Sequence, residues 1–359
     1  MSRARDFADL AGSADAGGLT GRNLIINGAM QVAQRGTSFT NPANTAYTLD
    51  RWKVTHIHGG AVDISQSTEA PVGFYNSLKV DVTTADASVA ASDMYMVYQL
   101  VEDNTARHLE IGTSDAVSVS VSFWVRSSKT GTYCVNIKTN DSTRAFVSEY
   151  TINSANTWEK KEVSLTLDTT GSWYSANVAL SLGFVIMAGT NYHISNETWT
   201  TTSSNFAPAT SNQVNGLDST ANEWYITGVQ LEVGEQATPF DHSESYGETL
   251  ARCQRYYYRL ESSADFTNFA VLRTYSTTKG TGTIYAPVSM RSVPTATNSA
   301  ASNFSYSLSA LSPIANYTQN HPQVFTVDAT GAFTANGAAS LENGTGSGAG
   351  IFIAYDAEL

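Results

Sequence analysis

Two histidines form the first spacing that could support chemistry. His56 and His58 stand two residues apart in a predicted strand, which places both imidazoles on one face. A zinc site needs three or four ligands, and no further His or Cys and no paired carboxylate follows nearby. The pattern therefore predicts ordinary structural histidines and no metal site.

Carboxylates are the second possibility, because glycoside hydrolysis uses two of them about 5–10 Å apart across a cleft. Three pairs are close in sequence: Glu232/Glu235, Glu244/Glu248 and Asp63/Glu69. Glu232 belongs to the closing strand of a predicted domain, and Glu248 is explained by a helix cap. Neither a Gly-x-Ser-x-Gly nucleophile motif nor a phosphate-binding glycine loop occurs. The sequence predicts a protein that is not an enzyme and uses no cofactor.

Aromatic side chains in polar loops are the candidates for binding. Trp173 and Tyr174 share a predicted loop, and Trp199 lies among Thr, Ser and Asn residues with Phe206 close by. Exposed rings flanked by hydroxyl and amide groups can stack on the faces of sugars, and such loops form adaptable recognition surfaces. The alternative is that these rings plug the ends of a core, since large aromatic side chains are mostly buried. Trp124 has the same two interpretations.

The composition favours sheets and excludes binding to nucleic acid. Of 359 residues only 14 % are charged, and the abundant Thr, Val, Tyr and Ser suit pleated, half-buried surfaces. A net charge of −12 leaves no basic stripe to displace counterions from nucleic acid. The most apolar run, 178–189, is shorter than the roughly 20 residues that span a bilayer, and the first residues lack a signal peptide. We expect a soluble protein made in the cytoplasm, without membrane insertion, whose Cys134 and Cys253 are buried free thiols.

Period-two alternation dominates the chain from residue 23. In 117–126 the apolar residues all point one way, which predicts a strand with one face on a core and the other face wetter. One helical turn is expected at 104–109. So many strands without alternating helices predict an antiparallel jelly-roll β-sandwich over 23–242, in which the first and last strands pair. The other strands are expected at 51–57, 61–66, 77–82, 94–101, 132–138, 144–152, 159–167, 178–187 and 223–233.

A break in this pattern at 243–258 predicts a short helical connector. Ser245 and Glu248 fit a capping box, in which the serine caps the helix and the glutamate reaches back. Alternation returns near 269–275, 282–286, 304–308, 324–327 and 350–355, while the glycine-rich stretch 331–350 suggests long surface hairpins. Residues 259–359 are therefore expected to form a second, smaller β-sandwich. The protein as a whole is predicted to be all-β.

Residues 1–22 form a separate piece with too little apolar surface to fold alone. A frayed terminus is one interpretation. The other is a peg that becomes ordered when it docks on another protein, through Phe7, Leu10 and the pair Arg3 and Arg5.

Several motifs between residues 23 and 258 resemble a single known domain. They begin with Asn23-Leu-Ile-Ile-Asn-Gly and Tyr47-Thr-Leu-Asp-Arg-Trp, and they continue with Ser122-Phe-Trp-Val-Arg-Ser. They close with Trp224-Tyr-Ile-Thr-Gly-Val-Gln and Cys253-Gln-Arg-Tyr-Tyr. Other matching strings are Thr130-Gly-Thr-Tyr-Cys, Thr157-Trp-Glu-Lys-Lys and Ala237-Thr-Pro-Phe. Together they are similar to a domain of bacteriophage tail-fibre and receptor-binding proteins.

The resemblance implies a structural protein of a phage virion, often a homotrimer, with a jelly roll like that of carbohydrate-binding modules. Related sugar-binding jelly rolls hold a calcium ion between their first and last strands through acidic residues. Gln31 and Gly228 stand at those positions here, and no metal is expected.

We therefore expect a tail fibre, located in the virion, that attaches the phage to glycans or lipopolysaccharide of the host surface. Residues 1–22 would dock on a tail or adaptor protein, and 259–359 would be distal and contact the receptor. A capsid-associated fibre or decoration protein with a purely structural role is the alternative. A depolymerase of surface polysaccharide is the less favoured one.

Overall fold

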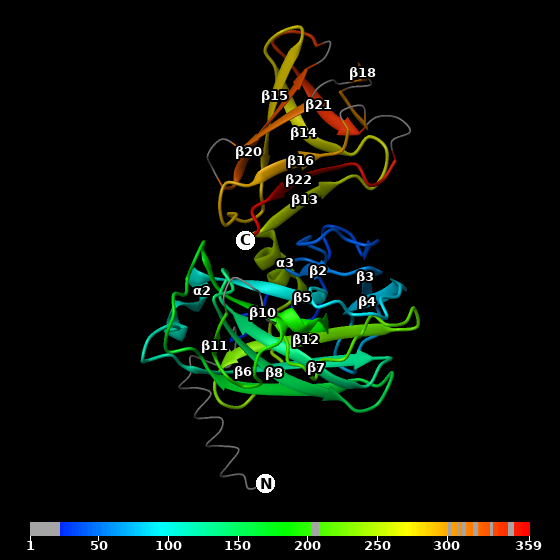
Figure 1. Cartoon of the computed structure of the whole chain (residues 1–359). Helices are drawn as coiled ribbons and strands as arrows, with labels where there is room; N and C mark the ends of the chain where they lie inside the picture. The colour runs from blue at the N-terminus through cyan, green and yellow to red at the C-terminus, as the bar shows by residue number, and fades with distance from the viewer. Residues whose placement is uncertain are drawn as a thin grey trace. The chain divides into compact units, whose positions relative to one another are not determined.

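The computed structural model describes residues 22–202, 208–300, 303–306, 309–310, 314–318, 322–330, 333–343 and 348–359 (Figure 1). The chain forms two compact units, Met1–Thr249 with Leu359 and Leu250–Glu358, called the N-terminal and C-terminal units below. Both consist of antiparallel sheets, so the protein is all-β, as the sequence predicts. Within the described residues no helix combines the length and the apolarity needed to cross a membrane.

The N-terminal unit is a sandwich of two six-stranded sheets. Sheet A has the order β1-β3-β4-β12-β6-β9, and sheet B has the order β11-β8-β7-β10-β5-β2. The chain crosses between the sheets from β4 to β5, from β5 to β6 and from β6 to β7, which gives a jelly-roll arrangement. The strands of sheet A are β1 (Ser38–Phe39), β3 (Ala61–Ser67), β4 (Ser77–Thr84), β12 (Glu223–Val233), β6 (Ser118–Ser127) and β9 (Glu159–Thr166). Those of sheet B are β11 (Thr200–Thr201), β8 (Arg144–Ile152), β7 (Gly131–Lys138), β10 (Val178–Ala188), β5 (Met94–Glu102) and β2 (Lys53–Ile57).

The alternation that predicted β6 is confirmed on its inner face and wrong on part of its outer face. Val121 and Phe123 lie in the core between the sheets. The outward Ser120 and Ser122 are also buried, with 0 % and 2 % exposed. Their partners across the strand pair are Glu232 and Gln230 of β12. The segment 234–242 is hydrogen-bonded to these two β12 side chains and so covers an outer face that the pattern had left to solvent.

The pairing of first and last strands is achieved by a segment without regular strand structure. Residues 23–28 run beside β12, where Leu24 donates to the carbonyl of Leu231 and Val229 donates to that of Gly28. A Cβ atom at Gly28 would lie 2.1 Å from the carbonyl oxygen of Val229, so this close approach requires glycine. The first strand itself, β1, pairs with β3 instead.

The predicted helical turn at 104–109 is confirmed as α2 (Asp103–Ala106) followed by η1 (Arg107–Leu109). The sequence missed a second turn, η2 (Thr190–Tyr192). Cys134 and Cys253 are both free and buried, as expected. Burial raises the pKa of the Cys134 thiol to about 11, which keeps it protonated and unreactive.

The capping box is confirmed at the start of α3 (Tyr246–Gln254). Ser245 N–H donates to Glu248 Oε2 at 2.6 Å, and Glu248 N–H donates to Ser245 Oγ at 3.3 Å. The boundary between the two units falls within this helix. The expected connector 243–258 is helical over part of its length, and Tyr257 already belongs to a strand of the C-terminal unit.

The C-terminal unit also contains two sheets, with the orders β13-β22-β16 and β18-β17-β21-β14-β15-β20-β19. Its core includes Leu272, Phe325, Leu341 and Tyr355, and the rings of Phe325 and Tyr355 are stacked with centroids 3.9 Å apart. The three-stranded sheet comprises β13 (Tyr257–Glu261), β22 (Phe352–Asp356) and β16 (Thr295–Asn298). The seven-stranded sheet comprises β18 (Ser309–Ala310), β17 (Phe304–Tyr306), β21 (Gly337–Asn343), β14 (Asn268–Thr274), β15 (Lys279–Tyr285), β20 (Val324–Thr330) and β19 (Ile314–Thr318).

The interpretation of 331–350 as surface hairpins is wrong for β21. This strand lies between β17 and β14 in the larger sheet, and its Leu341 is fully buried. Ala339, Leu341 and Asn343 alternate inward with small or polar neighbours. The surrounding glycines hide this period-two pattern in the sequence.

Candidate functional site

The predicted binding rings Trp173, Tyr174 and Trp199 do lie together, at one end of the N-terminal sandwich. The rings of Trp173 and Trp199 meet edge to face with centroids 5.5 Å apart, and Trp199 also contacts Phe146 at 5.4 Å. Trp173 is buried, with 9 % exposed, while Tyr174 and Trp199 are partly buried against the same core. Phe206 lies outside the described residues, as do Arg3, Arg5, Phe7 and Leu10.

The polar atoms of this end cluster are already engaged within the protein. The indole N–H of Trp173 donates to the carbonyl of Thr170 at 3.1 Å, and that of Trp199 donates to the carbonyl of Thr166 at 2.9 Å. The hydroxyl of Tyr174 accepts from Ile111 N–H, and its ring lies 4.2 Å from the guanidinium carbon of Arg107. This geometry is that of a plug over the end of the core, which was the alternative interpretation. Whether any of these rings binds a ligand stays a prediction.

An ion pair fixes the loop beneath the plug. Arg144 donates from Nε and Nη2 to the two carboxylate oxygens of Asp168, at 2.5 and 2.8 Å. Burial by itself would raise the pKa of Asp168, but the hydrogen bonds from Arg144 and Thr170 outweigh it and lower that pKa. This bidentate pair compensates the charge of Asp168 inside the protein.

The histidine pair is placed as a structural feature. His56 stacks on Tyr95 at 5.5 Å, His58 meets the same ring edge to face, and His56 Nε2 lies 3.0 Å from the carbonyl of Pro42. Burial, followed by the charge of His56, lowers the pKa of His58. In the part of the chain that the structure describes, no three His, Cys, Asp or Glu side chains gather to hold a metal ion.

The two residues at the positions expected for calcium ligands make other contacts. The carbonyl of Gln31 accepts a hydrogen bond from Gln66, and Gly228 lies under two aromatic rings. Nearby Glu232 is 2 % exposed, pairs with Arg22 at 3.0 Å and accepts two hydrogen bonds from Thr238. These contacts give Glu232 a structural role in holding the segment 234–242.

The motifs that carry the family resemblance form a structural clamp. Asn27 donates to the carbonyls of Val32 and Asp50, and its own side-chain oxygen accepts from Val32 N–H. Arg51, 1 % exposed, donates to the carbonyl of Leu100, and the indole of Trp52 donates to the carbonyl of Asn27. These residues join the opening segment to sheet B, so the motif marks the scaffold and not a binding site.

A second group of rings lies on the outer face of sheet A, and among them only Trp124 was considered for binding from the sequence. We call it the sheet-face cluster: Phe74, Trp124, Trp158, Tyr225, Phe240 and His242. Its members come from the loop between β3 and β4, from β6 and β12, and from the segments before β9 and after β12. Apart from Tyr225, which is buried, they are partly or fully exposed.

Tyr225 forms the centre of one row of this cluster. In the strand register it faces Lys79 of β4 on one side and Arg126 of β6 on the other. The guanidinium carbon of Arg126 lies 5.0 Å from the Tyr225 ring centroid, and Trp158 meets the ring edge to face at 6.1 Å. The hydroxyl of Tyr225 donates to Glu223 at 2.8 Å, and burial raises its pKa to about 12.

Charged groups surround this row. Lys79 pairs with Glu223 at 2.7 Å, and Arg126 pairs with Glu69 and donates to the carbonyl of Asn156. Burial is the largest single effect and tends to lower the pKa of Lys79, but the hydrogen bond to Glu223 and the nearby charges of Tyr225, Asp81 and Glu223 together outweigh it and raise that pKa. The row therefore offers the partly exposed ring of Trp158 beside fixed donors and acceptors, which suits recognition of a polar ligand with apolar faces.

The second row depends on a bulge in β12. The register with β6 shifts between Thr227 and Gln230, and Gly228 there has φ of +60°. A Cβ atom at Gly228 would lie 2.5 Å from Phe74 and 3.1 Å from Trp124, so only glycine lets both rings approach. Phe74 in turn contacts Phe240 at 5.1 Å and His242 at 5.1 Å.

The two tryptophans of the sheet-face cluster differ from those of the end cluster in their polar atoms. Neither the indole N–H of Trp124 nor that of Trp158 makes a hydrogen bond within the described residues. Both side chains are partly exposed, so these donors face solvent. The alternation along β6 predicted that Trp124 and Arg126 point outward, and this was the sequence signal that could have identified the sheet-face cluster.

Comparisons with known proteins assign no ligand to this cluster. No family model and no curated protein matches the sequence. Among solved structures, a putative sugar-binding protein from Bacteroides thetaiotaomicron is 13 % identical with a TM-score of 0.35, covering 59 % of this chain and 100 % of that one. TmCBM61, solved in complex with β-1,4-galactotriose, is 10 % identical with a TM-score of 0.29, covering 59 % and 99 %.

The enzymatically active domain of tailspike protein 4 from bacteriophage CBA120 is also similar. It is 12 % identical with a TM-score of 0.31, and the match covers 59 % of this chain but 22 % of that one. The present chain therefore spans a small part of that protein. Because these identities and TM-scores are low, the fold is described from the strand order alone. The comparisons name no family for the chain.

Proposed function

We propose that this protein binds glycans through the sheet-face cluster, as part of a bacteriophage appendage that attaches to the host surface. The observation that carries the proposal is the pair Trp124 and Trp158, whose rings are partly exposed and whose indole N–H groups have no partner within the described protein. Rings stack on sugar faces while neighbouring donors and acceptors bind sugar hydroxyls. Arg126, Glu69 and Lys79 supply such groups beside the rings.

The role in a virion rests on the motif resemblance between residues 23 and 258. The proposal keeps the expected homotrimer, because weak glycan contacts repeated on one particle gain avidity through effective concentration. It also keeps residues 1–22 as the segment that docks on a tail or adaptor protein. We propose binding without catalysis, since Glu232 and Asp168, two conspicuous buried acids, are held by Arg22 and Arg144.

A glycan array with the full-length protein tests the binding site. We expect binding to one or more neutral oligosaccharides, and a loss of at least about tenfold in affinity for Trp158→Ala and Trp124→Ala, which corresponds to about 1.4 kcal/mol. Tyr246→Ala is the matched control, because it removes an aromatic ring that is 56 % exposed on α3 and belongs to neither cluster. Its affinity should stay within about twofold of the wild type.

Equal losses for all three variants, or retained binding by both tryptophan variants, would contradict this site. If Trp199→Phe abolished binding while the sheet-face variants bound normally, the end cluster would be the site instead. Release of reducing ends from the bound glycan would show that the protein is a depolymerase.

Purified phage particles test the biological setting. Immunogold labelling should place the protein on an appendage, and particles carrying a chain without residues 1–20 should lack it although the shortened protein stays soluble. Absence of the protein from purified particles would refute the virion role, whereas labelling over the capsid would favour the structural fibre or decoration protein. Light scattering of the isolated protein should give the mass of three chains.

A further inference from the structure

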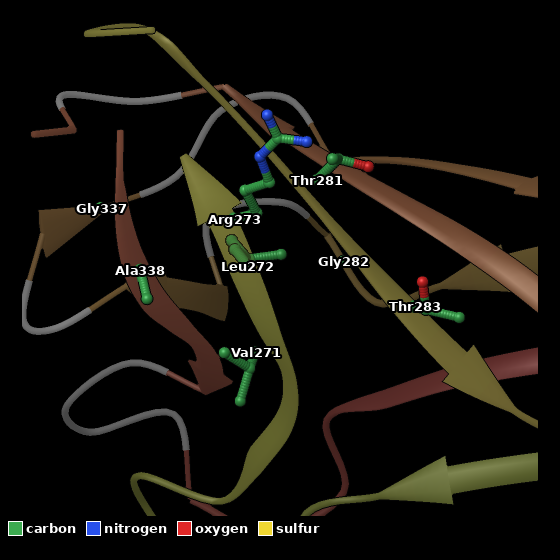
Figure 2. Close-up of a pocket in the computed structure, with 8 residues that line it drawn as sticks. All are labelled: Val271, Leu272, Arg273, Thr281, Gly282, Thr283, Gly337 and Ala338. Atoms are coloured by element: carbon green, nitrogen blue, oxygen red, sulfur yellow. The ribbon is translucent and has the colours of Figure 1, made fainter. Parts of the chain in front are cut away.

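The C-terminal unit has an open hollow on the outer face of its seven-stranded sheet, far in sequence from the sheet-face cluster. Its volume is about 580 Å³, and Figure 2 shows its lining on three adjacent strands. β14 contributes Val271 and Arg273, β15 contributes Thr281 and Thr283, and β21 contributes Ala338. The hollow exists because small side chains stand on both sides of Arg273, which pairs with Thr281 in β15 and with Ala338 in β21.

Arg273 is an exposed cation, and it has no partner in the part of the chain that the structure describes. Among the described residues its guanidinium makes no hydrogen bond and no ion pair. The other arginines of this unit are engaged, as Arg259 is with Glu261 and Arg291 is with backbone carbonyls. In a chain with a net charge of −12, acidic residues outnumber basic ones, so an exposed arginine without an ion pair is unexpected on electrostatic grounds.

Lys279 places a second unpaired cation on the same face. It stands at the start of β15, two residues before Thr281, and its side chain makes no ion pair within the described part of the chain. Asp328 of β20 lies across from Thr281, on the side of β15 away from Arg273. The acid therefore borders the hollow, and the two cations stand on its β14–β15 side.

Two exposed tyrosines extend this face along the strands. Tyr275, 46 % exposed, follows β14 beside Lys279, and Tyr285, 67 % exposed, ends β15. Tyr285 stands six positions after Lys279, which corresponds to about 20 Å of strand. Val271, 67 % exposed, adds an apolar patch between them. The face thus combines rings, hydroxyls and cations over a length that suits an oligosaccharide.

We propose that this face binds an oligosaccharide that carries anionic groups, with Arg273 and Lys279 contacting the anion, Thr281 and Thr283 contacting hydroxyls, and Tyr275 and Tyr285 contacting sugar faces. Arginine binds carboxylate and phosphate groups through paired N–H donors, so either a sugar acid or a sugar phosphate meets the requirement. This site is separate from the sheet-face cluster and does not depend on the function proposed for it.

Titration calorimetry of the full-length protein tests the proposal with three probes: oligogalacturonate, a phosphorylated mannan oligosaccharide and its uncharged counterpart. We expect binding of at least one acidic probe, weaker at higher salt because exposed charges are screened. Arg273→Gln should lower that affinity at least tenfold, and Lys279→Gln by a smaller factor. The acidic probe that binds identifies the carboxylate or the phosphate as the source of the charge.

Lys160→Gln is the matched control, because it removes one exposed cation from the N-terminal unit and should change the affinity less than twofold. Trp158→Ala should leave acidic binding unchanged even if it abolishes neutral binding, so failure of one site is distinguished from failure of the other. Absence of binding by both acidic probes, or unchanged affinity in Arg273→Gln with an unchanged melting temperature, would overturn the proposal.

Discussion

Two aromatic clusters of the N-terminal unit contain the same residue types and differ in what their polar atoms do. In the end cluster, the indoles of Trp173 and Trp199 donate to the carbonyls of Thr170 and Thr166. In the sheet-face cluster, Trp124 and Trp158 have no such partner within the described residues. A buried donor needs a hydrogen-bond partner inside the protein, whereas an exposed donor is hydrated and remains available to a ligand. The comparison teaches that hydrogen bonding, more than ring type, separates the enclosed end cluster from the exposed sheet-face cluster that we propose as the glycan site.

Removal of the plug should give the largest loss of stability. Trp173→Ala leaves a cavity against the core and is expected to lower the free energy of unfolding by about 3–5 kcal/mol. Urea denaturation followed by fluorescence measures this change. A loss below about 1 kcal/mol together with weaker glycan binding would reverse the comparison and make the end cluster the binding site.

A substitution in the β12 bulge under the sheet-face cluster should give the second largest loss of stability. Gly228→Ala forces a Cβ atom into Phe74 and Trp124 at a positive φ, with an expected cost of about 2–4 kcal/mol from strain and overpacking. We also expect it to weaken glycan binding, because both rings must move. Gly36→Ala is a useful control, since φ there is +123° but no atom lies within 4 Å of the added Cβ.

The ion pair under the end cluster should make stability depend on pH. Asp168→Asn leaves Arg144 without its bidentate partner and is expected to cost roughly 2–3 kcal/mol at neutral pH. Because the folded protein lowers the pKa of Asp168, its stabilisation is complete above the ordinary value near 3.8 and is lost as the pH falls below it. The variant should therefore lose less stability than the wild type between about pH 4 and pH 2. Parallel curves for the two proteins would contradict this role.

The smallest effect on stability is expected for Trp158→Ala, at about 1 kcal/mol or less, because its ring is partly exposed and makes one edge contact with Tyr225. Differential scanning calorimetry measures it beside the glycan affinity. A large loss of stability would show that Trp158 is part of the packing of sheet A, and the contrast between the two clusters would disappear.

The sequence predicted the strands well because one face of each strand packs on a core. β8 and β12 begin and end where the alternation predicted, and the capping box of Ser245 and Glu248 is formed. The prediction failed where burial depends on residues distant in sequence. Ser120 and Ser122 are covered by a segment more than a hundred residues later, and β21 is concealed among glycines.

For the candidate site, too, the local features were predictable and the contacts between distant residues were not. The sequence identified Trp173, Tyr174 and Trp199 as rings in polar loops, and it placed Trp124 on the outward side of its strand. It could not show that Thr170 and Thr166 engage the first group, because those hydrogen bonds depend on loop geometry. The grouping of Trp158, Tyr225 and Arg126 required the register of three strands that are distant in sequence.

By itself the sequence determined an all-β chain and the positions of most strands in the N-terminal unit, because these follow from local alternation and composition. The tertiary structure alone decided which aromatic rings are enclosed and which have free donors. It also decided that Arg273 and Lys279 stand on one face without an ion pair to any residue that the structure describes. The physical reason is that hydrogen bonds, burial and charge pairing are set by neighbours that sheet register brings together from distant parts of the chain.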